Sequence, residues 1–308
     1  MINPSPKPNP FAPAVKKQHA LRLALVGPGG AGKTFTALRL AQGLGGKIAC
    51  IDTEHGSAAL YAPPFAFDHL VLESFAPQDY IDAIQAAATY GYAVLIIDSL
   101  SHAWMGKGGI LEMKEAVASR DYGGNDRNAW RTVTPEHNRL VEAIIRSPLH
   151  IIATMRSRVE YVAEPDEHGK TVIRRIGLKP MQQDGLDFEF DIVGDLDSTH
   201  TLTITKTHCS ALSRAVIPEP GEELARTLKA WLTEGADPTM TEDQVKTLWE
   251  LGKAQGLSVG DLMTLINHTL HTAYRTPREV TQAQFPQILT ALQAQQTPAA
   301  ESAQAATA

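Results

Sequence analysis

Short apolar runs alternate with amphipathic segments along the first half of the chain. Four runs are apolar enough to be strands buried on both faces. They are residues 21–26 (LRLALV), 47–52 (KIACID), 93–97 (AVLII) and 149–154 (LHIIAT). Helical spacing of apolar residues marks residues 33–44, residues 77–90 and a segment that Thr134-Pro135 opens. Strands that alternate with helices predict an α/β fold with a mostly parallel sheet covered on both faces. Residues 189–194 and 200–206 are expected to be late strands that could pair as a hairpin.

The pattern changes near Gly235–Pro238. Three short helical patterns follow, each opened by a capping signal: Thr241-x-x-Gln244, Ser258-x-x-Asp261 and Thr281-x-x-Gln284. Trp249, Leu262, Ile266, Phe285 and Leu289 could form a small core there. We therefore expect four parts. They are a flexible Pro-rich arm (1–19), a large α/β domain (20–235), a small helical domain (240–293) and a disordered Ala/Gln-rich tail (294–308).

Composition narrows the class of protein. The formal net charge is −6, so the whole molecule is not a basic nucleic-acid coat, and any polyanion site must be a local patch. Cys50 and Cys209 form neither a metal-spaced pair nor a disulfide framework, which suits a reducing compartment. The N-terminal residues lack the apolar core of a signal peptide, and no apolar run approaches the ~18–20 residues that span a bilayer. These features favour a cytoplasmic protein.

One glycine-rich segment carries a specific chemical signal. Its residues are Gly27, Pro28, Gly29, Gly30, Ala31, Gly32, Lys33 and Thr34, which match G-x-x-x-x-G-K-[ST] in full. Glycines let the backbone turn its N–H groups toward phosphate oxygens, and the helix that follows directs its positive end to the same place. Lys33 is expected to reach the β- and γ-phosphates of ATP, and the Thr34 hydroxyl is expected to bind Mg²⁺. The buried strand before the motif and the helix after it favour this interpretation over a chance glycine-rich turn.

Two carboxylates are expected to complete the site. Asp98 ends an apolar strand at the sheet edge where open α/β folds bind ligands, and it would hold Mg²⁺ through water. Ser99 follows it, where many ATPases carry the carboxylate that activates water. The best substitute is Glu54, just past the second strand and at the same edge, where it could orient a water facing the γ-phosphate. From spacing alone, a solvated loop acid is an equally good interpretation of Glu54.

The segments around these carboxylates resemble a known family. IDTEHG (51–56), followed by LIIDSLSHAW (95–104), resembles the RecA recombinase core, whose matching Glu is the catalytic base and whose Asp-Ser strand binds magnesium. Further segments resemble a narrower group, the phage-encoded RecA-like ATPases linked to single-strand annealing and recombination. These segments are residues 130–144, 150–161, 177–197 and 204–209. The resemblance spans roughly residues 20–232 and implies a RecA-like P-loop NTPase core that hydrolyses ATP with Mg²⁺ in the cytoplasm of a bacterial host.

The resemblance also implies a sensor and a DNA-binding loop. A polar sensor ends the strand after the magnesium strand, and Arg156 is the candidate here, although RecA usually has Gln at that place. The DNA-binding loop would fall within about 157–187, and residues 156–180 hold 6 basic and 4 acidic groups. Basic side chains would neutralise phosphates, and an aromatic ring could stack on a base. The candidate residues are Arg158, Tyr161, Lys170, Arg174, Arg175 and Lys179. Without the resemblance, a solvated charged hairpin is the better interpretation.

Lys206 loosely matches the late-strand lysines of RecA filaments, which reach the γ-phosphate of a neighbouring protomer. This match implies a homo-oligomer in which the site is completed between subunits. From the residue alone, an isolated surface lysine is the default interpretation. The polar stretch 106–128, between Trp104 and Trp130, is interpreted as a solvated insertion. His102, His137, His150 and His208 show no metal-ligand spacing.

Three functions remain open at this point. The first is an ATPase acting on single-stranded DNA in phage-type recombination or annealing, with hydrolysis stimulated by DNA. The second is a nucleotide-switched loader or adaptor that binds a protein partner through the C-terminal helices. The third and least favoured is a P-loop small-molecule kinase, since residues 119–131 make a poor Arg-rich lid. The sequence does not choose between annealing, strand invasion and loading.

Overall fold

The computed structural model describes residues 14–120, 126–165, 171–235 and 239–294. The chain forms two compact units. The larger is Ala20–Leu232, and the smaller joins the residues from Thr233 onward with the N-terminal residues up to His19. Each unit is described below by itself.

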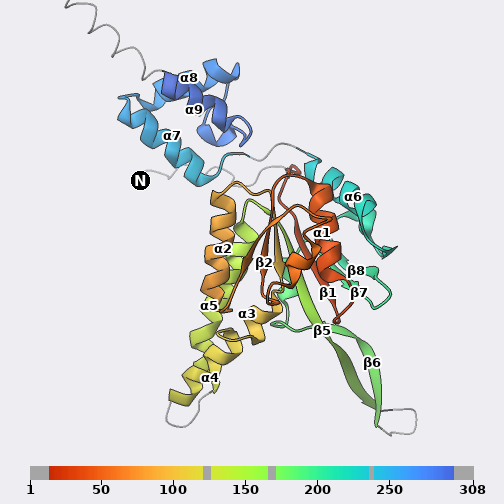
Figure 1. Cartoon of the computed structure of the whole chain (residues 1–308). Helices are drawn as coiled ribbons and strands as arrows, with labels where there is room; N and C mark the ends of the chain where they lie inside the picture. The colour runs from red at the N-terminus through yellow and green to blue at the C-terminus, as the bar shows by residue number, and fades with distance from the viewer. Residues whose placement is uncertain (1–13, 121–125, 166–170, 236–238, 295–308) are drawn as a thin grey trace, which may run out of the picture. The chain divides into compact units, whose positions relative to one another are not determined.

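A nine-stranded sheet, counted over the described residues, organises the larger unit (Figure 1). Its strands are β1 (Arg22–Gly27), β2 (Ile48–Asp52), β3 (Asp68–Val71), β4 (Val94–Asp98), β5 (His150–Pro165), β6 (Thr171–Pro180), β7 (Ile192–Leu196), β8 (Thr201–Thr207) and β9 (Val216–Pro218). The order across the sheet is β3-β2-β4-β5-β1-β7-β8-β9, and β6 pairs with β5. The pairs from β3 to β7 are parallel, whereas β5–β6, β7–β8 and β8–β9 are antiparallel. The α/β class and the mostly parallel sheet are therefore confirmed.

Two helical layers cover the sheet. Alternate residues of a strand point to opposite faces, so Leu23 and Leu25 of β1 join one core cluster while Ala24 and Val26 join the other. The first cluster is covered by α1 (Lys33–Leu44) and α6 (Glu222–Thr233), and the second by α2 (Pro77–Thr89) and α5 (Asp126–Arg146) (Figure 1). The remaining elements of this unit are α3 (Ser101–Met105), α4 (Ile110–Arg120), η1 (Ser57–Tyr61), η2 (Leu186–Glu189) and η3 (Ser210–Leu212).

One expectation about the middle of the chain is wrong. The helix expected to open at Thr134-Pro135 begins at Asp126 and carries Pro135 in its interior. A buried stripe runs through the proline, from Ala129 and Val133 to His137, Leu140 and Ile144, and its packing holds the helix together across the missing N–H. The stretch interpreted as a solvated insertion contains α4 and the start of α5, and Trp104 stacks on Trp130 at a centroid distance of 5.7 Å.

Arg22 is the one charge within the first apolar run, and the fold gives it a structural role. Its guanidinium donates to the carbonyl oxygens of Leu149 (2.8 Å), Ile145 (2.8 Å) and Ser147, where α5 ends. These carbonyls have no intrahelical donor, so the arginine caps the helix from the neighbouring strand. Burial lowers the pKa of Arg22 to about 10, against the opposing charge of Asp191.

The β5–β6 hairpin leaves the sheet at a defined residue. β5 pairs with β1 in parallel as far as Arg156, opposite Gly27, and pairs with β6 from Ser157 onward. The hairpin extends beyond the body of the sheet in Figure 1. One chain segment is thus both a central strand and an arm, and the change occurs at Arg156.

The smaller unit is helical. It contains α7 (Glu242–Ala254), α8 (Val259–Leu270), η4 (Pro277–Glu279) and α9 (Phe285–Ala294). Capping boxes form at Thr241–Gln244 and Ser258–Asp261, and the buried core includes Leu262 and Ile266. Of the expected N-terminal arm, residues 14–19 are described, and Lys17 donates to the Thr239 hydroxyl at 3.5 Å. Among the helices described, none is long and apolar enough to cross a membrane.

Candidate nucleotide site

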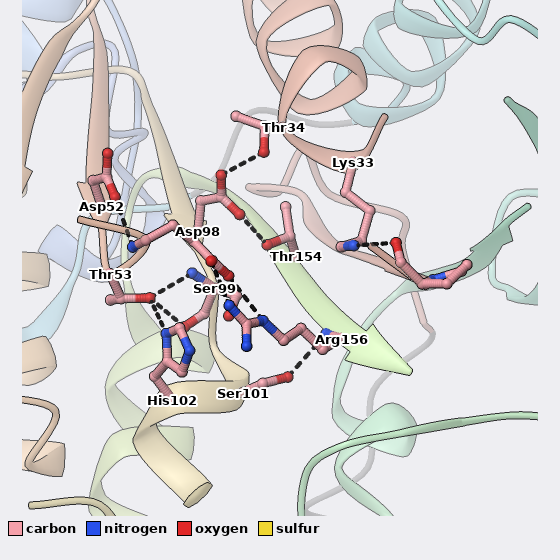
Figure 2. A network of polar contacts seen from close by, with 12 residues as sticks. Lys33, Thr34, Asp52, Thr53, Asp98, Ser99, Ser101, His102, Thr154 and Arg156 are labelled. Atoms are coloured by element: carbon pink, nitrogen blue, oxygen red, sulfur yellow. Dashed lines mark hydrogen bonds and ion pairs between the residues drawn. The ribbon is translucent and has the colours of Figure 1, made fainter. Parts of the chain in front are cut away.

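The predicted chemical groups meet at one edge of the sheet, at the carboxyl ends of β1, β2 and β4 and at the residue where β5 stops pairing with β1. The P-loop follows β1, Glu54 follows β2, Asp98 ends β4 and Arg156 lies on β5. In Figure 2 these elements converge on Asp98, with Thr34 and Thr154 directed at its carboxylate. The parallel register explains the convergence, since Asp52 lies beside Asp98 and Gly27 beside Arg156.

The glycines of the P-loop serve different purposes. A Cβ on Gly27 would lie 2.4 Å from the Leu196 carbonyl oxygen, so close strand packing requires glycine there. Gly32 has φ +85°, the left-handed region that favours glycine, and the helix begins directly after it. The space beside Gly29 and Gly30 is open to 4 Å. The first N–H groups of α1 have no intrahelical acceptor, so this loop can cradle phosphate oxygens.

Lys33 folds back over the loop. Its ammonium donates to the carbonyl oxygens of Gly27 at 3.0 Å and Pro28 at 2.8 Å. Burial lowers the pKa of Lys33, while Asp98 and Glu54 act in the opposite direction. The amine is therefore held over the cradle by two weak acceptors, which phosphate oxygens can replace.

Two threonines flank Asp98. Thr34 donates to its Oδ2 at 2.6 Å, and Thr154, which the sequence did not single out, donates to its Oδ1 at 2.5 Å. Asp98 is 3% exposed, and burial raises its pKa, although both hydroxyl bonds oppose that rise. A hydroxyl and a carboxylate are the hard oxygen ligands that suit Mg²⁺ bound together with phosphates. Thr34 and Asp98 would hold the ion, and it would neutralise charge on the phosphates.

Glu54 and Arg156 contact each other. Arg156 Nε donates to Glu54 Oε1 at 3.0 Å, and a second guanidinium nitrogen pairs with Oε2. Burial alone would raise the pKa of Glu54, but the hydrogen bond and charge of Arg156 outweigh it, so the net pKa is lowered. Glu54 is thus ionised and able to orient water, and its oxygens already bind a guanidinium.

A second polar network fixes the backbone on both sides of Glu54. The Asp52 carboxylate accepts from the N–H groups of Glu54 (2.7 Å) and Ala58 (2.9 Å). The Thr53 hydroxyl accepts from the Ser99 N–H at 2.8 Å and lies 2.7 Å from His102 Nδ1 (Figure 2). Burial lowers the pKa of His102, and Arg156 lowers it further, which favours the neutral ring. No local pattern in the sequence marks this role of His102.

A cavity of about 490 Å³ adjoins the P-loop. Its lining combines P-loop residues with Phe35, Arg39, Tyr61, His200, Glu219 and Pro220. The ring centroids of Phe35 and Tyr61 lie 6.0 Å apart in this lining. The volume of the cavity lies in the range of ligand pockets. Next to a phosphate cradle, an aromatic-lined cavity can take the base and ribose of a nucleotide. Sequence reasoning missed it because four segments far apart in the chain build it.

Comparison with known proteins agrees with this geometry. A family model described as an AAA domain matches residues 19–233. The chain belongs to the AAA domain family. Membership in this family supports a nucleotide-hydrolysing P-loop protein, and nucleotide binding in such proteins typically involves Mg²⁺. No curated protein matches the chain.

In this AAA domain Lys206 lies away from the cradle. Its amine donates to the carbonyl oxygens of Asp187 (3.2 Å), Phe188 and Phe190 (2.6 Å), so it caps η2 from strand β8. A role in a neighbouring subunit would require Lys206 to leave these acceptors. That role stays a prediction.

Five of the six candidate DNA-binding residues fall on β5 or β6. Arg158 lies directly opposite Lys179 in the ladder, and Lys179 also donates to Asp184 at 2.9 Å. Tyr161 is opposite Arg175, and Arg174 is opposite Val162. Lys170 lies outside the described residues. The expected loop is therefore a two-stranded arm whose register brings basic positions together.

Proposed function

We propose that this AAA domain protein hydrolyses ATP with Mg²⁺ and uses the cycle to act on single-stranded DNA, in recombination or annealing of the phage type. The observation that carries the proposal is the position of Arg156. It is bound to Glu54 at the nucleotide site, and it is also the last sheet residue before the hairpin with the candidate DNA-binding positions.

Arg156 is tied to its surroundings by backbone as well as side chain. Its N–H donates to the Ser101 hydroxyl at 2.9 Å, and its carbonyl accepts from the Met181 N–H at 2.7 Å, just after β6 ends. A γ-phosphate would compete with Glu54 for the guanidinium, because both are anionic acceptors of the same fork. If Arg156 moved toward the phosphate, it would release Glu54. The movement would also displace the backbone of both hairpin strands, β5 and β6, where they leave the sheet.

The hairpin has the chemistry for a polyanion. Like charges directly opposite each other in an antiparallel pair are unfavourable, and Arg158 faces Lys179 in that way. A phosphate backbone lying along the arm would offset this repulsion. Binding would weaken as salt rises, because releasing counterions into a more concentrated solution gains less free energy. Because the net charge of the chain is −6, a basic patch that binds DNA has to be local. A single hairpin meets this requirement.

The chemical roles follow from the contacts. Lys33 and the P-loop N–H groups bind phosphate oxygens, and Thr34 with Asp98 holds the ion. Once separated from Arg156, Glu54 orients a water and accepts its proton. A homo-oligomer whose site is completed through Lys206 is a further part of the proposal. A protein partner on the C-terminal helices belongs to the alternative, the loader or adaptor function.

The test is ATP hydrolysis with and without single-stranded DNA at low salt, comparing wild type with Glu54→Gln. The change should lower turnover by ~10²–10⁴-fold, the usual contribution of a general base, and leave nucleotide binding intact. Glu73→Gln is the matched control, because Glu73 follows β3 at the same sheet edge, one strand further out.

Three results would change the proposal. Turnover indifferent to DNA would overturn the DNA role, and stimulation only by a protein partner would replace it with the loader or adaptor function. DNA stimulation that survives Glu54→Gln would keep the DNA role and remove Glu54 as the base.

A further inference from the structure

The turn between β7 and β8 reaches the P-loop, because β7 lies beside β1 in the sheet. His200, in that turn, places its Nδ1 3.1 Å from the carbonyl oxygen of Ala31, 169 residues away in the chain. Ala31 is fully buried. A carbonyl can only accept, so the Nδ1 of His200 carries the proton in this contact. A buried carbonyl of the phosphate loop thus has a side-chain donor from a distant turn.

The turn is built to hold the ring in place. The Asp197 carboxylate accepts from the N–H groups of Thr199 (2.8 Å) and Thr201 (2.9 Å), and the Asp197 carbonyl accepts from the His200 N–H at 3.1 Å. His200 itself has φ +60°, a left-handed conformation that is uncommon for residues other than glycine. Such a conformation persists where the surroundings fix it, and here the Asp197 contacts fix it.

The ring also lies close to the next P-loop residue and to the cavity wall. A Cβ on Gly32 would stand 2.9 Å from His200 Nδ1, so the approach depends on glycine. The His200 carbonyl accepts from the Glu219 N–H at 3.0 Å, and the Glu219 carbonyl accepts from Arg39 of α1 at 3.2 Å. His200, Glu219 and Arg39 therefore form a connected wall of the cavity beside the P-loop.

We propose that His200 is a positioning residue of the nucleotide site, an inference that rests on the proposed ATP binding. The peptide that joins Ala31 to Gly32 is planar and trans, so its C=O and N–H point in opposite directions. By holding the Ala31 carbonyl outward, His200 keeps the Gly32 N–H turned toward the phosphate cradle before a nucleotide arrives. Without this donor, the buried carbonyl turns to seek another partner, and binding has to restore the loop.

The test separates the donor from the backbone conformation. His200→Gly keeps the left-handed backbone and loses the donor, whereas His200→Asn keeps both, because Asn tolerates this region and carries an N–H at the δ position. His271→Gly is the matched control, since His271 is also left-handed (φ +51°) and ends α8 in the smaller unit. Affinity is measured by titrating each full-length variant with a fluorescent ATP analogue and Mg²⁺, alongside ATPase kinetics and melting without nucleotide.

We expect His200→Gly to bind about tenfold more weakly, corresponding to about 1.4 kcal/mol, with a raised KM and a kcat changed less than about twofold. His200→Asn and His271→Gly should stay within about twofold of wild type. Asp197→Ala, which loosens the turn but keeps the imidazole, should weaken binding in the same direction and serves if His200→Gly fails to fold.

Wild-type affinity in His200→Gly, or equal weakening in His200→Asn and His200→Gly, would overturn the role of His200. A fall in melting temperature without any change in affinity would also overturn it, because His200 would then be only structural. Failure of the wild-type protein to bind the analogue would overturn the proposed ATP binding, a result visible before any variant is compared.

Discussion

The two halves of the candidate site differ in how complete they are without a ligand. On the binding side, Thr34, Asp98 and Thr154 form a closed set of hydrogen bonds, and Lys33 lies over the glycine cradle. On the catalytic side, the Arg156 guanidinium forms an ion pair with the Glu54 carboxylate, so each group is the other's partner. In the proposed cycle, the phosphate-binding groups are already in place, and Glu54 has to leave Arg156 before it can orient a water.

Removing the amine of the binding side should give the largest effect. Hydrogen bonds to charged groups contribute about 1.5–3 kcal/mol each, so the loss of two phosphate contacts in Lys33→Ala should weaken ATP binding by roughly 100-fold or more. Calorimetric titration with ATP and Mg²⁺ measures it. Lys47→Ala is the control, because Lys47 precedes β2 at the opposite edge of the sheet. Equal affinities of the two variants would refute a preassembled phosphate site.

Separating the catalytic pair should change the pH dependence of turnover. Arg156 holds the pKa of Glu54 low, so in Arg156→Ala that pKa rises and the acid limb of the kcat/KM profile moves to higher pH. We also expect turnover at pH 8 to fall about tenfold and DNA stimulation to be lost, since the proposed sensor of the γ-phosphate is removed. Arg156→Lys keeps the charge but not the two-pronged contact. In Arg156→Lys, the acid limb of the kcat/KM profile should therefore stay at low pH, while stimulation of turnover by DNA is lost.

If the acid limb of the kcat/KM profile does not move in Arg156→Ala, Arg156 does not control the pKa of Glu54.

The ion pair between Glu54 and Arg156 should contribute little to the stability of the fold. Both side chains are partly exposed, and such pairs contribute about 0–1 kcal/mol. The lowered pKa of Glu54 stabilises the fold at pH values above its unfolded pKa, and this contribution is lost as the pH falls through the folded value.

A different division separates what the sequence predicts from what it does not. The P-loop, Asp98 and Glu54 are visible because each follows an apolar strand, and parallel strands bring their carboxyl ends together. Thr154 and His200 act only through partners that are distant in sequence, so no local pattern marks them. The alternation of strands and helices predicts the sheet, but Pro135 misleads because a buried stripe overrides its helix-breaking tendency.

A matched pair of threonine variants would test whether the Asp98 set is structural, functional or both. Thr154→Val and Thr34→Val each remove one donor to the buried carboxylate, so each should lower the free energy of unfolding by about 1–3 kcal/mol. Only Thr34→Val removes a proposed magnesium ligand. Urea unfolding measures the first effect, and the Mg²⁺ dependence of nucleotide binding measures the second. A Mg²⁺ dependence altered equally in both variants would contradict the assignment of Thr34 as the ligand.

The smallest effect is expected from a carboxylate just outside both halves. Asp195 of β7 lies beside Val26, the residue that leads into the P-loop, and burial raises its pKa to about 6. The unfolded pKa is about 3.9, so the folded protein loses stability as the pH rises from about 4 to about 6, carries the full loss above pH 6 and recovers it as the pH falls back toward 4. Asp195→Asn should raise the free energy of unfolding by about 1 kcal/mol at pH 8, below the ~3 kcal/mol of the full shift because the side chain keeps some solvent. Urea unfolding at pH 8 and pH 4 measures this, and a gain of the same size at both would rule out ionisation as the cause. If Asp195→Asn raises the free energy of unfolding only at high pH, the ionised Asp195 carboxylate destabilises the wild-type fold. Negative charge at this edge of the sheet would then have a cost in stability outside the phosphate site as well.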